Sequence, residues 1–254
     1  MKLNDISDQE WALRVDLACL FRINAHLGWE DSINTHSTMR VPGSEHHFLI
    51  NPFGLRLGEV KASALVKIDL DGNVIGESPH PINRAGYVIH SAIHMGRTDA
   101  KCVIHTHSLP GMAVAAAAEG LVEHNIFALG FHGCLSYHDF EGASGDHNTS
   151  ERKRLAASLG PSNKAMILRN HGLLTCGKSV AQAFTKMHSL EKSCQLQIAA
   201  QAGGDLVLPS EDVCKHTAQQ FRLSENTESE GDLDKLAWKA LLRKLDRINP
   251  GYDA

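Results

Sequence analysis

Short apolar segments alternate with longer segments of helical periodicity, and this alternation constrains the fold more than any other feature of the sequence. Strands are expected at residues 46–51, 63–70, 101–104 and 165–168. Helices are expected at residues 82–95, between the strand at 101–104 and residue 118, and at 179–202. Interleaved strands and helices favour an α/β fold in which helices cover both faces of one sheet.

Both ends of the chain are expected to be helical. Ser7 and Glu10 form a Ser-x-x-Glu capping box, which starts a helix that ends near Gly28. Residues 224–232 are polar and acidic, and the leucine spacing beyond them predicts an amphipathic helix. We expect three parts, listed here in chain order: a domain at 1–222, a polar linker at 223–232, and a C-terminal helix at 233–254 that packs on the domain or on a neighbouring subunit.

The composition argues against several classes of protein. The chain has 25 basic and 29 acidic side chains, so it lacks the strong positive charge of a nucleic-acid-binding protein. No apolar run approaches the roughly 18 residues of a membrane helix, and the first residues lack the apolar core of a signal peptide. Six widely spaced cysteines without a CxxC pair are typical of reduced thiols. We therefore expect a cytoplasmic protein that binds neither nucleic acid nor membrane.

The sequence contains 16 histidines, and three of them follow predicted strands. His105 and His107 come after the strand at 101–104, where alternate residues face the same way and can present two imidazoles to one ion. His171 follows the strand at 165–168, and Gly172 beside it allows backbone and ion to approach closely. Three histidines with one vacant position are typical of a catalytic zinc site.

Spacing alone leaves a second interpretation of these histidines open. Side chains at strand ends can instead donate to backbone carbonyls, and in a histidine-rich chain an H-x-H pair arises easily by chance. Periodicity also does not show that His171 lies near His105.

Longer stretches of the sequence resemble a known family. CVIHTHS and GPSNKAMILRNHGLLTCGKSVAQAF, with MRVPG, FLINPFG and VKASALVKIDLDG upstream, resemble the class II aldolase/adducin family over residues 11–204. AGYVIHSAIH and LGPSNKAMILRNHG are most similar to the adducin head domain and bacterial proteins like it.

This resemblance implies a three-layer αβα domain around a central mixed or antiparallel sheet. It also implies a homotetramer with active sites at subunit interfaces. The family's divalent metal, generally zinc, would be held by His105, His107 and His171. Iron also binds three histidines, so the identity of the metal stays open.

The chain departs from the sugar-phosphate aldolases of that family at their acidic proton shuttle, whose position is taken by Gly86. Arg84 and Ala85 replace a serine pair that helps to hold phosphate. The phosphate loop survives only loosely at residues 34–37, where Asn34 and Ser37 are candidate substrate-binding residues. We therefore expect a substrate without phosphate.

Other groups must then handle the proton and the substrate. His90 lies one helical turn beyond the glycine, and His94 lies one turn further on the same face. His90 is the candidate catalytic acid or base, or a partner that fixes a ligand, although both histidines could simply pack against the sheet. Tyr137 or His132 could reach the site of a neighbouring subunit. Arg40 could bind an anionic substrate group or pair with a carboxylate.

We therefore predict a metal-dependent, aldolase-like lyase acting on a small hydroxy-carbonyl or keto-acid substrate, whose carbonyl or enediolate oxygen the metal polarises. Two alternatives stay open: a nonheme iron oxygenase, and a noncatalytic adducin-like binding module. Adducins carry a long basic tail beyond the head domain, and this sequence shows none, so we favour an enzyme.

Overall fold

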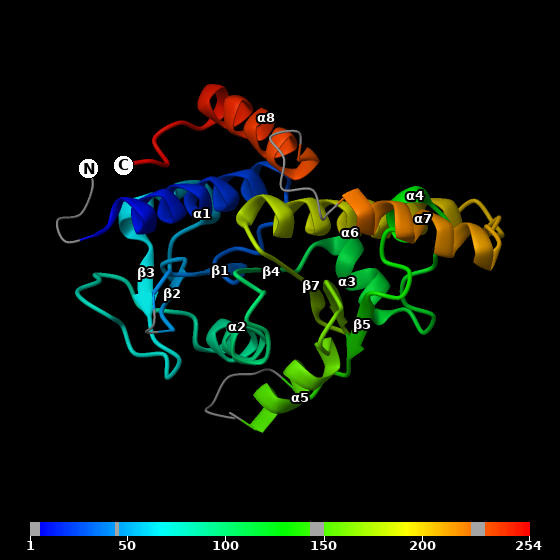
Figure 1. The fold of residues 1–254 in the computed structure, drawn as a ribbon, viewed down its shortest axis with the longest axis horizontal. Helices are drawn as coiled ribbons and strands as arrows, with labels where there is room; N and C mark the ends of the chain where they lie inside the picture. The colour runs from blue at the N-terminus through cyan, green and yellow to red at the C-terminus, as the bar shows by residue number, and fades with distance from the viewer. Residues whose placement is uncertain (1–5, 44–45, 143–149, 225–231) are drawn as a thin grey trace.

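The computed structural model describes residues 6–43, 46–142, 150–224 and 232–254 (Figure 1). Within them, seven strands form one sheet in the order β3-β2-β1-β4-β7-β6-β5. The strands are β1 (His36–Arg40), β2 (Phe48–Ile50), β3 (Val66–Ile68), β4 (Cys102–Thr106), β5 (Leu135–His138), β6 (Ala165–Leu168) and β7 (Gly172–Gly177). Only β5 and β6 run parallel; the other neighbours are antiparallel. The predicted mixed sheet is confirmed.

Helices cover both faces of this sheet, so the predicted three-layer αβα architecture is also confirmed (Figure 1). Helices α2 and α5 lie on one face, and α1, α3 and α6 lie on the other. Their bounds, with those of the remaining helices, are α1 (Asp8–His26), α2 (Arg84–Gly96), α3 (Leu109–Ala116), α4 (Ile126–Leu129), α5 (Ser150–Leu159), α6 (Val180–Gln201), α7 (Glu211–Ser224) and α8 (Leu233–Ile248). Two single-turn 3-10 helices, η1 (Leu57–Glu59) and η2 (Ala62–Ala64), connect β2 to β3. Among the described helices, none is long and apolar enough to cross a bilayer.

Alternation along the central strand β4 decides which side chains reach which layer. Cys102 and Ile104 belong to the large core under α1 and α6, whereas Val103 packs with α2 and α5. Because strand residues alternate, His105 lies on the same face as Val103. The opposite face receives Thr106, whose hydroxyl donates to the buried carboxylate of Glu191 over 2.8 Å. The H-x-H pair is thus directed toward the α2 side of the sheet.

The last helix packs on the same chain. Helix α8 contacts α1 and α6, and Trp238 and Leu245 are buried there. Arg22 of α1 donates to the carbonyl oxygens of Asn249 and Pro250 over 3.2 and 2.6 Å. The predicted linker at 223–232 lies largely outside the described residues, and the division into a domain, a linker and a C-terminal helix remains a prediction.

Candidate metal centre

Three imidazoles converge where β4 meets the β6–β7 turn. The Nε2 atom of His105 lies 2.8 Å from Nε2 of His107 and 3.3 Å from Nε2 of His171. The Nε2 atoms of His107 and His171 are 3.0 Å apart. Three imidazole nitrogens bound to one tetrahedral zinc at about 2.0–2.1 Å stand roughly 3.3 Å apart. The triad therefore has nearly the spacing that one ion requires.

Hydrogen bonds at Nδ1 of His105 and His107 determine which ring nitrogen carries the lone pair. Nδ1 of His105 lies 2.8 Å from the carbonyl oxygen of Leu173, and Nδ1 of His107 lies 3.0 Å from the carboxylate of Asp31. Both partners only accept, so in the neutral rings Nδ1 carries the hydrogen. Each Nε2 then presents a lone pair to the other at 2.8 Å, which is repulsive unless a cation lies between them.

The backbone of the β6–β7 turn allows this convergence. Asn170 adopts the left-handed conformation with φ 56°, which asparagine tolerates better than most residues. A Cβ atom on Gly172 would lie 2.3 Å from the carbonyl oxygen of Thr106 and 3.1 Å from the ring of His107. A side chain at position 172 would push the β4 end and the turn apart, so this glycine allows two backbone segments to approach closely; its predicted approach to an ion stays a prediction.

The three rings of the triad differ in their exposure to solvent. His105 is fully buried, whereas 16% of the His107 side chain is exposed. Burial, followed by repulsion from the neighbouring histidines, holds the pKa of His105 well below its ordinary value. Burial and then His107 lower the pKa of His171 to about 4. His105 and His171 are thus neutral near pH 7, which is the form that binds a metal.

A second cluster of histidines lies behind the triad, between β1 and α2. His36 pairs with His105 across the strands, and their ring centroids are 5.0 Å apart. Nδ1 of His36 lies 2.8 Å from Nε2 of His90, and Nδ1 of His90 lies 2.7 Å from the hydroxyl of Thr38. The same hydroxyl is 2.8 Å from Nε2 of His94. All four side chains are buried.

The direction of each hydrogen bond in this second cluster follows from its last member. Nδ1 of His94 lies 2.9 Å from the carbonyl oxygen of Ala100, which can only accept. His94 therefore accepts from the Thr38 hydroxyl, Thr38 accepts from His90, and His90 accepts from Nδ1–H of His36. Burial, before any other cause, lowers the pKa of His94 to about 3 and holds the pKa of His90 well below its usual value, so the rings are neutral.

The predicted catalytic residue His90 therefore contacts His36 and Thr38 and none of the triad rings. Of the two roles predicted for it, this placement fits a partner that fixes another residue. His36 itself was not predicted, although it fills the space beside Gly86. A Cβ atom on Gly86 would lie 2.6 Å from the His36 ring. The position of the family's acidic residue is thus packed against an imidazole.

Three predicted substrate-binding residues occupy different places around β1. Asn34 is exposed in the turn before the strand. Ser37 is fully buried on the face opposite His36, and its hydroxyl has no partner in the described structure. This burial disagrees with the predicted binding role of Ser37, because strand alternation directs it away from the triad. Arg40 lies at the far end of β1 and donates to the carbonyl oxygen of His94 over 2.5 Å.

Tyr137 and His132 are not brought to the triad within one chain. Tyr137 lies on β5, with β6 and β7 between it and β4. Its hydroxyl accepts from the backbone N–H of Leu121 over 3.0 Å. His132 follows α4 and pairs with Glu123, with 2.8 Å between Nδ1 and the carboxylate. Their action on a neighbouring subunit stays a prediction.

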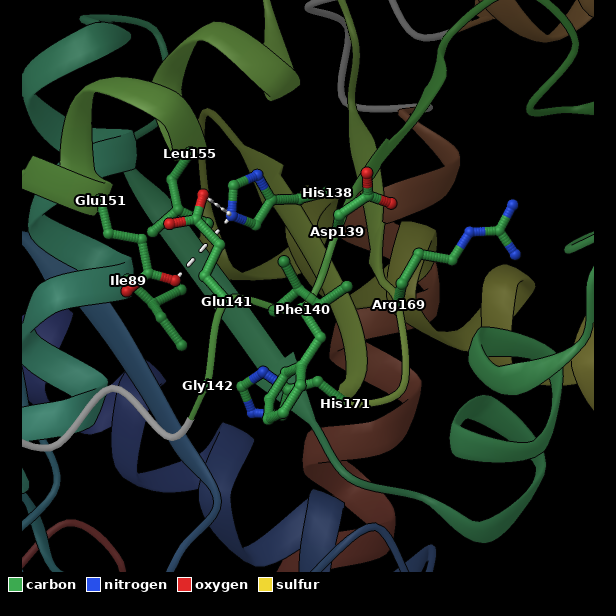
Figure 2. A pocket seen from close by; sticks show the side chains of 11 residues that line it. Ile89, His138, Asp139, Phe140, Glu141, Gly142, Glu151, Leu155, Arg169 and His171 are labelled. Atoms are coloured by element: carbon green, nitrogen blue, oxygen red, sulfur yellow. Dashed lines mark ion pairs between the residues drawn. The ribbon is translucent and has the colours of Figure 1, made fainter.

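A small pocket borders the triad on the side of His171 (Figure 2). Phe140 covers this histidine, with ring centroids 6.2 Å apart. At the other end of the pocket, His138 points toward Glu141 and Glu151, whose carboxylates lie 3.7 and 3.8 Å from its Nε2 atom (Figure 2). The pocket thus has an aromatic wall at the triad and a polar wall away from it.

Comparison with known proteins places this fold in one structural class. The fold is that of class II aldolases: the chain superposes on a crystal structure of an aldolase II superfamily protein from Pseudomonas syringae with a TM-score of 0.91 and 44% identity, covering 98% of both chains. It also superposes on the L-fuculose 1-phosphate aldolase of Glaciozyma antarctica PI12 with a TM-score of 0.82 and 28% identity, covering 98% of this chain and 95% of that one.

Residues 15–198 match the family described as "Class II Aldolase and Adducin N-terminal domain", and the chain belongs to this family. It is 46% identical to the "Putative aldolase class 2 protein" of Caulobacter vibrioides, over 97% of this chain and 94% of that protein. It is 39% identical to alpha-adducin of Rattus norvegicus, over 96% of this chain but only 34% of that protein. The predicted resemblance to the family is confirmed.

Proposed function

We propose that this protein is a metal-dependent carbon–carbon lyase of the class II aldolase type, acting on a small hydroxy-carbonyl or keto-acid substrate. The observation that carries the proposal is the convergence of the Nε2 atoms of His105, His107 and His171, which lie 2.8–3.3 Å from one another. Zinc suits three nitrogen ligands with a vacant position, and it is the metal we propose. We also propose a cytoplasmic homotetramer.

His105, His107 and His171 would hold the metal. A divalent metal bound there supplies a Lewis acid that polarises the oxygen of a carbonyl or enediolate. The chain's own contribution is to keep the ligands oriented. Asp31 holds Nδ1–H of His107, and the Leu173 carbonyl holds Nδ1–H of His105, so both rings present Nε2 outward.

His90 contributes as a positioning residue in this proposal. It accepts a hydrogen bond from His36, whose ring packs beside His105. Loss of His90 would free the His36 ring to turn, and the wall behind the triad would change shape. A role for Tyr137 at the site of a neighbouring subunit remains part of the proposal; within its own chain the hydroxyl accepts from the backbone N–H of Leu121 and can still donate.

The substrate we propose lacks phosphate. Gly86 stands where the sugar-phosphate aldolases carry their acidic residue, and Ser37 of the loosely matching phosphate loop is buried away from the triad. Asn34 alone of that loop is exposed near the turn that carries Asp31. These features support a small carbonyl compound that binds directly at the triad.

A noncatalytic binding module is the second candidate, and the similarity to alpha-adducin across nearly the whole chain favours it. The two candidates differ in what the triad does. An enzyme loses its reaction when the triad loses a ligand, whereas a binding module keeps its fold and its partner.

The test is deuterium exchange by protein purified without a histidine tag. Small hydroxy-ketones and keto acids are incubated with the chain in D₂O, and deuterium next to the carbonyl and any cleavage products are followed by NMR. We expect exchange or cleavage that a chelator stops and zinc restores, with near one metal per chain bound at the triad.

His107→Ala should abolish the exchange and the metal bound at the triad, while His26→Ala, an exposed residue at the end of α1, serves as the matched control. Circular dichroism confirms that both variants are folded. The proposal is wrong if folded wild-type protein retains only trace metal after exposure to zinc, or if His107→Ala reacts as fast as wild type.

A further inference from the structure

A second group of metal-ligating side chains lies apart from the triad, where α7 packs against α4 (Figure 1). Glu123 precedes α4, His132 follows it, and Cys214 lies in the first turn of α7. One donor atom from each residue lies within 4.8 Å of the others. We propose that these three side chains form a second divalent-cation site, selective for a thiolate-accepting ion such as zinc.

Local structure explains how the three ligands come together. Helix α4 is a single turn, and the Asn125 side chain caps it by accepting from the N–H groups of Phe127 and Ala128. The chain therefore reverses within a few residues, and Glu123 meets His132 with 2.8 Å between carboxylate oxygen and Nδ1. The site is built on a rigid turn.

A separate contact holds α7 against that turn. Arg222, near the end of α7, donates to the backbone carbonyl oxygen of His132 over 2.7 Å. This bond uses neither ring nitrogen of His132, and it does not involve Cys214. The approach of α7 is thus set by a contact outside the proposed site, so a cation would find the ligands already gathered.

Negative charge at the cluster attracts a divalent cation. The carboxylates of Glu123 and Glu211 both lie beside His132, and a cation bound there would displace the proton of the Cys214 thiol. Cys214 is 4% exposed, so it is shielded from bulk solvent.

A fourth ligand stands one helical turn away from Cys214. Glu211 is three residues earlier on the same face of α7, and its carboxylate lies 3.8 Å from Nε2 of His132. The side chain is 65% exposed and can rotate toward the cluster. Sulfur, nitrogen and two carboxylate oxygens make a donor set that suits tetrahedral zinc and disfavours magnesium or calcium.

The role of this site is to fasten α7 to the turn that carries α4. It shares no residue with the histidine triad, so it stands or falls independently of the proposed lyase activity. Zinc bound there should raise the thermal unfolding midpoint even in a variant that lacks His107.

Cobalt(II) separates the two sites, because only a thiolate ligand gives a sulfur-to-cobalt charge-transfer band in the near ultraviolet. The full, metal-stripped chain is titrated with Co²⁺. We expect the band to saturate at one equivalent, to disappear in Cys214→Ser, and to be displaced by Zn²⁺. The triad contains no sulfur, so its filling cannot produce this signal.

Two further variants keep the test decisive. Cys134→Ser, which removes the half-buried cysteine nearest in sequence to His132, should keep the band. His132→Ala leaves every thiol in place and should weaken cobalt binding at Cys214 by at least about tenfold, since even loss of a supporting residue costs that much. The proposal is overturned if folded wild-type protein shows no band, or if the band persists unchanged in Cys214→Ser or His132→Ala.

Discussion

Two histidine clusters share one face of the sheet and differ in how their hydrogen bonds end. In the cluster of His36, His90 and His94, each donor meets an acceptor, and the series finishes on a backbone carbonyl. In the triad, the backbone and Asp31 take the hydrogens, and lone pairs face each other. The first cluster is complete without a ligand, whereas the second is complete only with a cation. Burial and histidine content alone do not distinguish a structural cluster from a metal site.

The sharpest test of this difference is to remove one ring of the triad. We expect His107→Ala to lower catalytic turnover by at least about a thousandfold, because the metal supplies several kcal/mol of transition-state stabilisation. In chelator, the same variant should unfold at the wild-type urea concentration or above it, since facing lone pairs are removed. A large loss of metal-free stability would show that the triad is a structural cluster like its neighbour.

Removing a ring from the cluster of His36, His90 and His94 should lower stability and leave metal binding unchanged. His90→Ala deletes two buried hydrogen bonds and leaves a cavity, so we expect the free energy of unfolding to fall by about 2–4 kcal/mol. Metal content of the folded protein should stay near that of wild type. Urea unfolding in chelator, with His26→Ala as the exposed control, measures the loss; an unchanged midpoint would contradict the assignment.

Substitution of Asp31, which accepts from Nδ1–H of His107, should have a smaller effect on metal binding. Asp31→Asn keeps an acceptor for Nδ1–H but removes its negative charge, so the ring becomes a weaker ligand. We expect the affinity for zinc to fall by about tenfold, at the low end for such supporting residues. Competition with a chromophoric chelator measures this affinity. If affinity is unchanged, the Asp31 contact plays no part in holding the triad.

The last expected effect is a pH dependence of stability. His94 has an ordinary pKa of 6.5 that burial lowers to about 3 in the folded protein. Between these values the unfolded chain takes up a proton that the folded chain does not. The stability from neutral His94 is therefore complete above pH 6.5 and is lost by about 1.4 kcal/mol per pH unit as the pH falls. In urea unfolding between pH 4.5 and 6, His94→Gln should reduce the slope by this amount, and an unchanged slope would contradict the prediction.

Several elements with clear apolar patterns could be predicted from the sequence. The strand predicted at 165–168 coincides with β6, and the helices predicted at 82–95 and 179–202 correspond to α2 and α6. Strand β1 escaped prediction because its sequence, HSTMR, is mostly polar; it is buried between β2 and β4, where His36 and Thr38 bond to α2. Strands β5 and β7 and helices α5 and α7 were also missed.

The candidate site shows the same limit. The H-x-H pair is a local pattern, so the common orientation of His105 and His107 follows from strand geometry. The approach of His171 depends on β4 pairing with β7 across distant sequence, which no periodicity reveals. His36 could have been found from its spacing to Thr38, set against the helical spacing of His90 and His94. The contact of Asp31 with His107 could not be predicted from the sequence, because an aspartate before a strand is common.

The hydroxyl of Thr38 on β1 bonds to both His90 and His94 on α2, so the tautomer of one histidine determines the tautomer of the other. The carbonyl of Ala100 selects the tautomer of His94, and through Thr38 that choice passes to His90 and then to His36. Valine has the shape of threonine without the hydroxyl, so Thr38→Val would leave the backbone in place. It would nevertheless let His36 carry its hydrogen on either nitrogen, and the electrostatic potential behind His105 would change without any change of shape.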